Sequence, residues 1–238
     1  PVRHERASGV MSAPLLACFA GLALATRCPL DPSRARVEQT GWEVFGFSRT
    51  SNWTSALYKW TMITTIAATV APTEEAVCLA HSHGVRIVSL VDENMNFTNA
   101  TARRERIDGH VVKALELGTD GINLDIERFT GDREGLTLYV NELAVALRKN
   151  IAAAQLSFDL AIAPDGQTSH YDHRALARAL DFIVPMAYDE NWGSLTPAAN
   201  SGIHMLRTGL AQYQALGVPA SKLVVALPWC TPLPPPLP

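Results

Sequence analysis

The sequence lacks any concentration of basic charge. Its formal net charge is −3, and its basic residues are scattered apart from the short run Arg103–Arg106. Proteins that bind nucleic acid or an anionic membrane surface need a patch of basic residues to neutralise phosphate charges. The sequence therefore predicts no nucleic-acid partner and no membrane partner, and we interpret the Arg-rich run as a solvated helix face.

Motifs of several catalytic classes are also missing. There is no Gly-x-Ser-x-Gly elbow and no Cys-x-x-Cys pair, so hydrolysis by a nucleophilic serine or cysteine has no support. Histidines occur in pairs at 81 and 83 and at 170 and 173, but no third ligand accompanies either pair at metal-binding spacing. We predict neither a metal site nor a cofactor.

No apolar run is long enough to span a bilayer. The apolar stretch 13–25 ends in Ala23-Leu24-Ala25, a pattern typical of a secretory signal peptide cleaved after Ala25. A core helix is the alternative interpretation of this stretch. Asn-x-Ser/Thr sequons agree with entry into the secretory route. The predicted glycosylation sites are Asn52, Asn96 and Asn99.

Cysteines are few, and their number is informative. Of the four, Cys18 lies in the predicted signal peptide, which leaves Cys28, Cys78 and Cys230. In an oxidising compartment one of these three thiols has no partner, and the sequence leaves the pairing open. The odd number is a first indication of an incomplete chain.

A regular alternation of apolar runs and helical patterns follows residue 40. The strand candidates are mostly continuous apolar runs, as expected for strands covered on both faces. They are Trp42–Ser48, Met62–Val70, Val85–Val91, Gly121–Glu127, Gln155–Ala163, Phe182–Tyr188 and Lys222–Trp229. The predicted fold class is α/β, a (β/α)8 TIM barrel that is incomplete, with about seven strands. A doubly wound sheet stays open on this pattern, although no Gly-x-Gly-x-x-Gly turn supports it.

The fourth strand candidate carries alternating polar residues. Asn123, Asp125 and Glu127 alternate with apolar residues and therefore share one face of a strand. If this face points into a barrel, its carboxyl groups are least costly at the C-terminal mouth, where barrel enzymes have their active sites. Carboxyl groups two residues apart lie about 6 to 7 Å from each other. We therefore expect the charge of Asp125 to raise the pKa of Glu127, which suits a general acid. An edge strand with its polar face in water is the alternative.

These residues match a family motif. The segment from Asp120 to Glu127 resembles the Asp-x-x-(Asp/Asn)-x-Asp-x-Glu signature of the family 18 glycoside hydrolases, and similarity extends over most of residues 28–229. Asn123 stands where chitinases of the family usually have Asp, which favours the chitobiase-type branch. The resemblance implies retaining hydrolysis, in which the acetamido oxygen of the substrate attacks the anomeric carbon.

The resemblance also implies residue roles. Glu127 is the acid and later the base, and Asp125 orients the acetamido group. Asp120 and Asn123 are expected to support Asp125. Tyr188 is expected to hydrogen-bond the acetamido oxygen. Two further residues, Asp189 and Trp229, are expected to contact sugar.

The family pattern breaks after Trp229, where residues 230–238 are rich in proline and cannot form the closing strand. We predict three parts: 1–25 upstream residues and signal peptide, 26–229 an incomplete barrel domain, and 230–238 a tail foreign to the family. The implied partner is an N-acetylglucosamine-containing oligosaccharide, the implied location the lysosome, and a monomer is expected. This chain is expected to be poorly active or inactive, and a non-catalytic sugar-binding relative remains the alternative.

Overall fold

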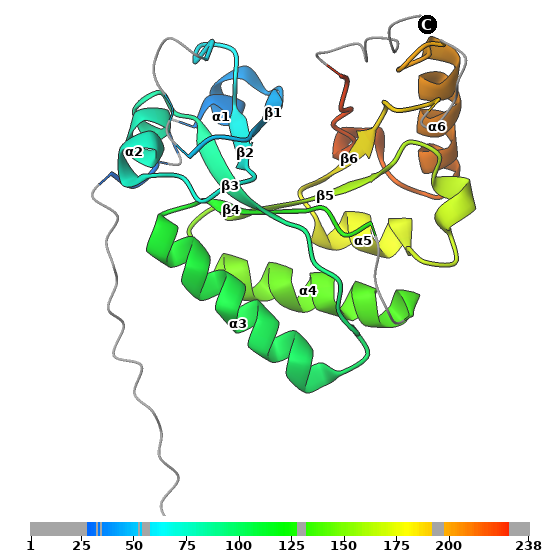
Figure 1. Cartoon of the computed structure of the whole chain (residues 1–238), viewed down its shortest axis with the longest axis horizontal. Coiled ribbons are helices and arrows are strands. Elements are labelled where there is room, and N and C mark those ends of the chain that lie inside the picture. Colours follow the sequence, from blue (N-terminus) through cyan, green and yellow to red (C-terminus); the bar gives the residue numbers. More distant parts are fainter. Residues whose placement is uncertain are drawn as a thin grey trace, which may run out of the picture.

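The structure is a computed structural model that describes residues 28–31, 33, 35–51, 53, 58–127, 132–191 and 198–228. Six parallel strands form one sheet in the order of the sequence. The strands are β1 (Phe45–Ser48), β2 (Thr65–Ala68), β3 (Arg86–Val91), β4 (Gly121–Leu124), β5 (Gln155–Ala161) and β6 (Phe182–Met186). The sheet curls into part of a barrel, which confirms the predicted α/β class (Figure 1).

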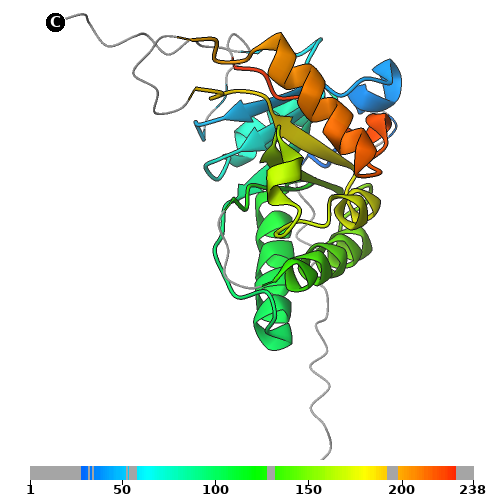
Figure 2. The same cartoon turned by 90° about the vertical axis from the view of Figure 1, so that its right-hand side faces the viewer.

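Helices alternate with these strands along the chain. They are α1 (Arg36–Thr40), α2 (Glu74–Ser82), α3 (Ala100–Leu117), α4 (Arg133–Asn150), α5 (His173–Ala179) and α6 (Ile203–Ala215), with short 3₁₀ turns at Pro164–Gln167 and Ala220–Lys222. Helices α3, α4 and α5 pack beneath the sheet, whereas α6 lies at the β6 end (Figures 1 and 2). The alternation of strand and helix along the chain therefore produces the layers expected of a barrel.

The main core lies between the sheet and these helices. Three apolar side chains of the β4 segment are at most 1% exposed, namely Ile122, Leu124 and Ile126. They belong to the same cluster as Leu136 and Leu143 of α4. Since side chains alternate across a strand, this packing turns the polar residues of β4 toward the inside of the curl.

Local signals explain where the long helix α3 begins and ends. The side chain of Asn99 accepts hydrogen bonds from the backbone N–H groups of Thr101 and Ala102, and so caps the first turn. The helix ends at Gly118, whose φ of 67° lies in the left-handed region that glycine adopts without strain. Asn99 therefore has a structural role in addition to its predicted glycosylation.

The prediction of a solvated Arg-rich face is wrong for Arg103. This side chain is 7% exposed, forms a two-point ion pair with Glu142 of α4 at 3.0 Å and donates to the carbonyl oxygen of Phe97 at 2.7 Å. Arg106 contacts Glu93 at 3.2 Å. Sequence spacing identifies a helix face but does not show whether another helix packs against it, as α4 does here.

The predicted seventh strand forms only in part. Within the described residues 222–228, two isolated parallel bridges join Leu223 to Ile183 and Ala226 to Met186. The N–H groups of Val224 and Ala226 donate to β6, and Ala187 donates to the carbonyl of Ala226. The next donor in this ladder belongs to position 185, which is proline and has no N–H. Pro185 therefore explains why the seventh segment is bridged to β6 without forming a continuous strand.

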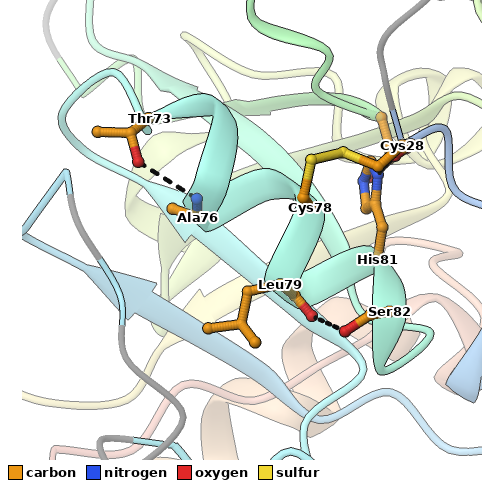
Figure 3. Close-up of a disulfide and its surroundings, with 8 residues drawn as sticks. Cys28, Thr73, Ala76, Cys78, Leu79, His81 and Ser82 are labelled. Carbon is orange, nitrogen blue, oxygen red and sulfur yellow. Dashed lines mark hydrogen bonds and ion pairs between the residues drawn. A yellow bond between two sulfur atoms is a disulfide. The ribbon is translucent and has the colours of Figure 1, made fainter.

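Both ends of the sequence contain predictions that the structure does not describe. The signal-peptide segment 1–25, Trp229 and the tail 230–238 lie outside the described residues. A disulfide joins Cys28 to Cys78 of α2, with their Cα atoms 5.2 Å apart (Figure 3). This bond answers the pairing question for two cysteines, whereas Cys230 lies in the tail. Across the described ranges, no helix is both long and apolar enough to cross a membrane.

Candidate active site

The polar side chains of the β4 segment become more exposed toward its C-terminal end. Asn123 lies within the strand and is fully buried, Asp125 is half-buried, and Glu127 is exposed. The backbone N–H of Asp125 still donates to the carbonyl of Val91 at 2.8 Å, so the residue stays in line with β3 after β4 ends. The segment therefore brings one carboxyl group to the open mouth and holds a second one just below it.

Below these carboxyl groups, Asn123 joins β4 to β5. Its amide nitrogen donates to the hydroxyl of Ser157 at 3.0 Å and to a carboxyl oxygen of Asp159 at 2.9 Å. Asp159 is 2% exposed. Burial raises the pKa of Asp159 well above its usual range, the charges of Asp125 and Glu127 add to this rise, and the hydrogen bond from Asn123 opposes it.

The pKa of Asp125 is raised to about 6, first by burial and then by the charges of Glu127 and Asp92. From the sequence we expected the charge of Asp125 to raise the pKa of Glu127. In the structure Asp125 is the more buried of the two, and burial is the largest cause of its raised pKa. Burial therefore makes Asp125 a carboxyl group of this site that takes up a proton more readily than an exposed aspartate.

Two tyrosines approach the same carboxyl groups. Tyr188 lies two residues beyond β6, and burial followed by the charges of Asp159, Asp125 and Glu127 raises its pKa. Tyr171, 4% exposed, donates from its hydroxyl to the carbonyl oxygen of Ile126 at 2.8 Å. Both hydroxyls therefore keep their protons at neutral pH, and Tyr171 fixes the backbone directly before Glu127.

Asp120 lies at the opposite end of β4. Its carboxylate accepts hydrogen bonds from the backbone N–H of Ile87 at 2.7 Å and from Nε2 of His81 at 2.9 Å. The other ring nitrogen of His81 contacts the carbonyl oxygen of Cys28 at 2.6 Å, beside the disulfide (Figure 3). The contacts of Asp120 thus anchor the start of the strand, and its expected support of Asp125 stays a prediction.

The remaining predicted residues lie at the periphery or outside the described part. Asp189 is exposed and has a left-handed backbone with φ 58°, and its N–H donates to Asn200 at 2.9 Å. Asn96 and Asn99 are both exposed. Asn52 and Trp229 lie outside the described residues. In the described ranges, no three His, Cys, Asp or Glu side chains come together as metal ligands.

Three further residues beside these carboxyl groups, Ser157, Asp159 and Tyr171, were not predicted from the sequence. The first two were detectable, because Gln155, Ser157 and Asp159 alternate with apolar residues in the same way as the polar residues of β4. Tyr171 follows β5 in a loop, and no periodic signal identifies it. Its contact with Ile126 depends on how the α5 region folds back over β4.

The curled parallel sheet and the carboxyl groups at its C-terminal edge define a barrel-type protein with an acidic mouth. The family described as "Glycosyl hydrolases family 18" matches residues 78–233, and the chain belongs to this family. This finding confirms the predicted resemblance.

Curated relatives agree with this assignment. Di-N-acetylchitobiase of Rattus norvegicus is 34% identical over 197 residues, which are 79% of this chain and 53% of the relative. The Homo sapiens protein of that name is 32% identical over 221 residues, covering 87% and 57%. The chain thus spans about half the length of the curated relatives it matches.

Solved structures show the same fold at low identity. The C-terminal domain of a putative chitinase from Desulfitobacterium hafniense DCB-2 has a TM-score of 0.67 at 16% identity, covering 79% of this chain and 66% of that one. Ostrinia furnacalis Group IV chitinase in complex with allosamidin has a TM-score of 0.63 at 15% identity, covering 79% and 66%. At this identity the likeness establishes the fold alone.

Proposed function

We propose that the protein is a glycosidase that cleaves β-1,4-linked N-acetylglucosamine at the reducing-end chitobiose core of asparagine-linked oligosaccharides. The observation that carries this proposal is the graded face formed by Asn123, Asp125 and Glu127. It places an accessible carboxyl group above a half-buried one at the mouth of the curled sheet. The di-N-acetylchitobiase relatives support the choice of substrate.

In this proposal Glu127 protonates the leaving glycosidic oxygen, since it is the exposed member of the group. The acetamido oxygen of the substrate attacks the anomeric carbon, so that the glycosidic bond breaks as a bond within the sugar forms. Glu127 then takes a proton from water, which opens the cyclic intermediate with retained configuration. One protein acid is sufficient because the substrate supplies the nucleophile.

Asp125 and Tyr188 orient the reacting acetamido group. Asp125 accepts a hydrogen bond from its N–H and stabilises the positive charge that develops in the ring. Tyr188 keeps its hydroxyl proton because of its raised pKa, and its O–H donates a hydrogen bond to the acetamido oxygen. Because the pKa of Asp125 is raised to about 6, the carboxylate form that this role requires is the major form only above that pH.

We place the protein in the lysosome, reached by the secretory pathway. The disulfide between Cys28 and Cys78 is of a kind that forms in oxidising compartments. Asn96 and Asn99 are exposed and accessible to glycosylation, and residues 1–25 carry the proposed signal peptide. We also propose that the protein acts as a monomer and has neither a nucleic-acid partner nor a membrane partner.

The test compares Glu127→Gln with Glu105→Gln, an exposed carboxyl of α3 as the matched control. Both are made in this chain and in a fusion that adds the C-terminal part of the rat relative, and release of N-acetylglucosamine from chitobiose-type substrate is measured. We expect Glu127→Gln to lower turnover by about 10²- to 10⁴-fold, with sugar binding retained in calorimetry. The control should match the parent.

The result that contradicts this assignment is turnover by Glu127→Gln close to that of its parent. A parent that binds chitobiose-type sugar but never cleaves it, even as the fusion, supports the non-catalytic sugar-binding alternative. The retained Glu127 favours the enzyme.

A further inference from the structure

A second buried carboxyl group lies beside Asp125 on the neighbouring strand. The parallel register of β4 and β5 pairs Leu124 with Phe158, so the next residues, Asp125 and Asp159, are neighbours on the inner face. Adjacent strands are about 4.8 Å apart. Carboxyl groups at such positions reach each other through one hydrogen bond when their side chains turn together.

The surroundings of Asp159 favour its neutral form. The side chain is 2% exposed, and its Oδ1 accepts a hydrogen bond from the uncharged amide of Asn123 at 2.9 Å. The charged groups that act on it are other carboxylates, Asp125 and Glu127. A buried carboxyl group without a cation and beside negative charges retains its proton.

Asp125 offers the acceptor that such a proton needs. Its Oδ1 is buried and has no hydrogen-bond partner among the described residues. A buried carboxylate oxygen without a donor is unfavourable, and a protonated carboxyl is a neighbour with a proton to donate.

We propose that Asp159 is a positioning residue that stays protonated and donates a hydrogen bond from its hydroxyl to Oδ1 of Asp125. The proton remains on Asp159, and no covalent bond changes. Asn123 holds the other oxygen of Asp159, so the carboxyl group is oriented from one side and donates on the other. The contribution of this contact to catalysis rests on the proposed role of Asp125, but the hydrogen bond itself does not.

The other titratable groups that face this pair come from several elements. Asp92 follows β3, Glu127 follows β4, Tyr171 follows β5 and Tyr188 follows β6. Tyr171 and Tyr188 are neutral at the pH values of interest, because burial and the nearby carboxylates raise the pKa of both. None of these four side chains can supply a positive charge that would favour an ionised Asp159.

The test measures the pKa of Asp125 by carbon-13 NMR of the side-chain carboxyl groups in the 238-residue chain, with Asp125→Asn for assignment. Asp159→Ala removes the donor, and we expect the pKa of Asp125 to rise by about one to two pH units. Asp159→Asn keeps a donor in its amide group, so the pKa should stay near that of the parent. Asp165→Asn, an exposed carboxyl, controls for loss of charge elsewhere.

A fall in the pKa of Asp125 in both Asp159 variants overturns the proposal, because it shows that a negative charge was removed. If Asp159→Ala fails to fold, Asp159→Asn alone decides, since an unchanged pKa supports a neutral Asp159 and a lowered pKa an ionised one. The titration requires no substrate. It therefore keeps its meaning if the proposed glycosidase function fails.

Discussion

Removal of the disulfide should destabilise the protein by an amount set by the loop that it closes. Cys28 and Cys78 are 50 positions apart, and the enclosed segment contains α1, β1, β2 and part of α2. Closing a loop of this length lowers the entropy of the unfolded chain, which corresponds to about 4 kcal/mol at 25 °C. Domains of this kind have unfolding free energies of about 5 to 15 kcal/mol, so Cys78→Ala should remove a large share of the stability.

Denaturant unfolding followed by circular dichroism measures this loss. Cys78→Ala, Cys28→Ala and the double variant should unfold at the same lower midpoint, because each removes the same bond. The parent protein in reductant should match them, and the variants should not respond to reductant. A loss below about 1 kcal/mol in Cys78→Ala would refute the reasoning, since it would mean that the bond does not restrict the loop.

Two further predictions concern stability away from the mouth. A Cβ atom at Gly209 of α6 would lie 2.1 Å from the carbonyl oxygen of Ile162. Gly209→Ala should therefore lower the free energy of unfolding by about 1 to 3 kcal/mol, measured in thermal melts. The control Gly166→Ala, which has open space around its Cβ position, should leave it unchanged. Burial lowers the pKa of His81, but its contacts with Asp120 and the Cys28 carbonyl outweigh burial and leave the pKa above 6.5. The protonated His81 therefore stabilises the protein fully below pH 6.5, and this effect is lost as the pH rises through the folded-state pKa. His81→Gln should flatten that part of a profile of stability against pH, and an unchanged slope would contradict the prediction.

The sequence was sufficient to predict the inner face of β4 but not what lies across from it. Alternation of polar and apolar residues is a local signal, so the shared face of Asn123, Asp125 and Glu127 was readable. The contact between Asn123 and Asp159 depends on the register of two strands that are 36 residues apart. Which residues of β5 lie beside those of β4 depends on how the two strands pack, so the contact with Asp159 could not be predicted from the β4 sequence alone.

The β6 edge illustrates a different limit. Pro185 lies within the predicted strand Phe182–Tyr188, and a proline removes one hydrogen bond from the ladder of a strand. The effect of this proline becomes clear only from the neighbouring segment, because an N–H at position 185 would donate to the carbonyl oxygen of Val224. Of the predicted strand Lys222–Trp229, the described residues 222–228 pair with β6 through two isolated bridges only, so the continuity of this strand was overestimated.

The two ends of the β4 segment separate stability from chemistry. Asp120 and Glu127 are seven residues apart, roughly 20 Å along an extended chain, and the motif that contains both does not show that their tasks differ. Asp120 is tied to His81 and to the backbone of β3, whereas Glu127 is exposed at the mouth. A carboxyl group therefore has different surroundings at the two ends. At the start of the strand it accepts hydrogen bonds from His81 and the backbone of β3, and at its end it is exposed at the mouth, where we propose that it acts as the acid.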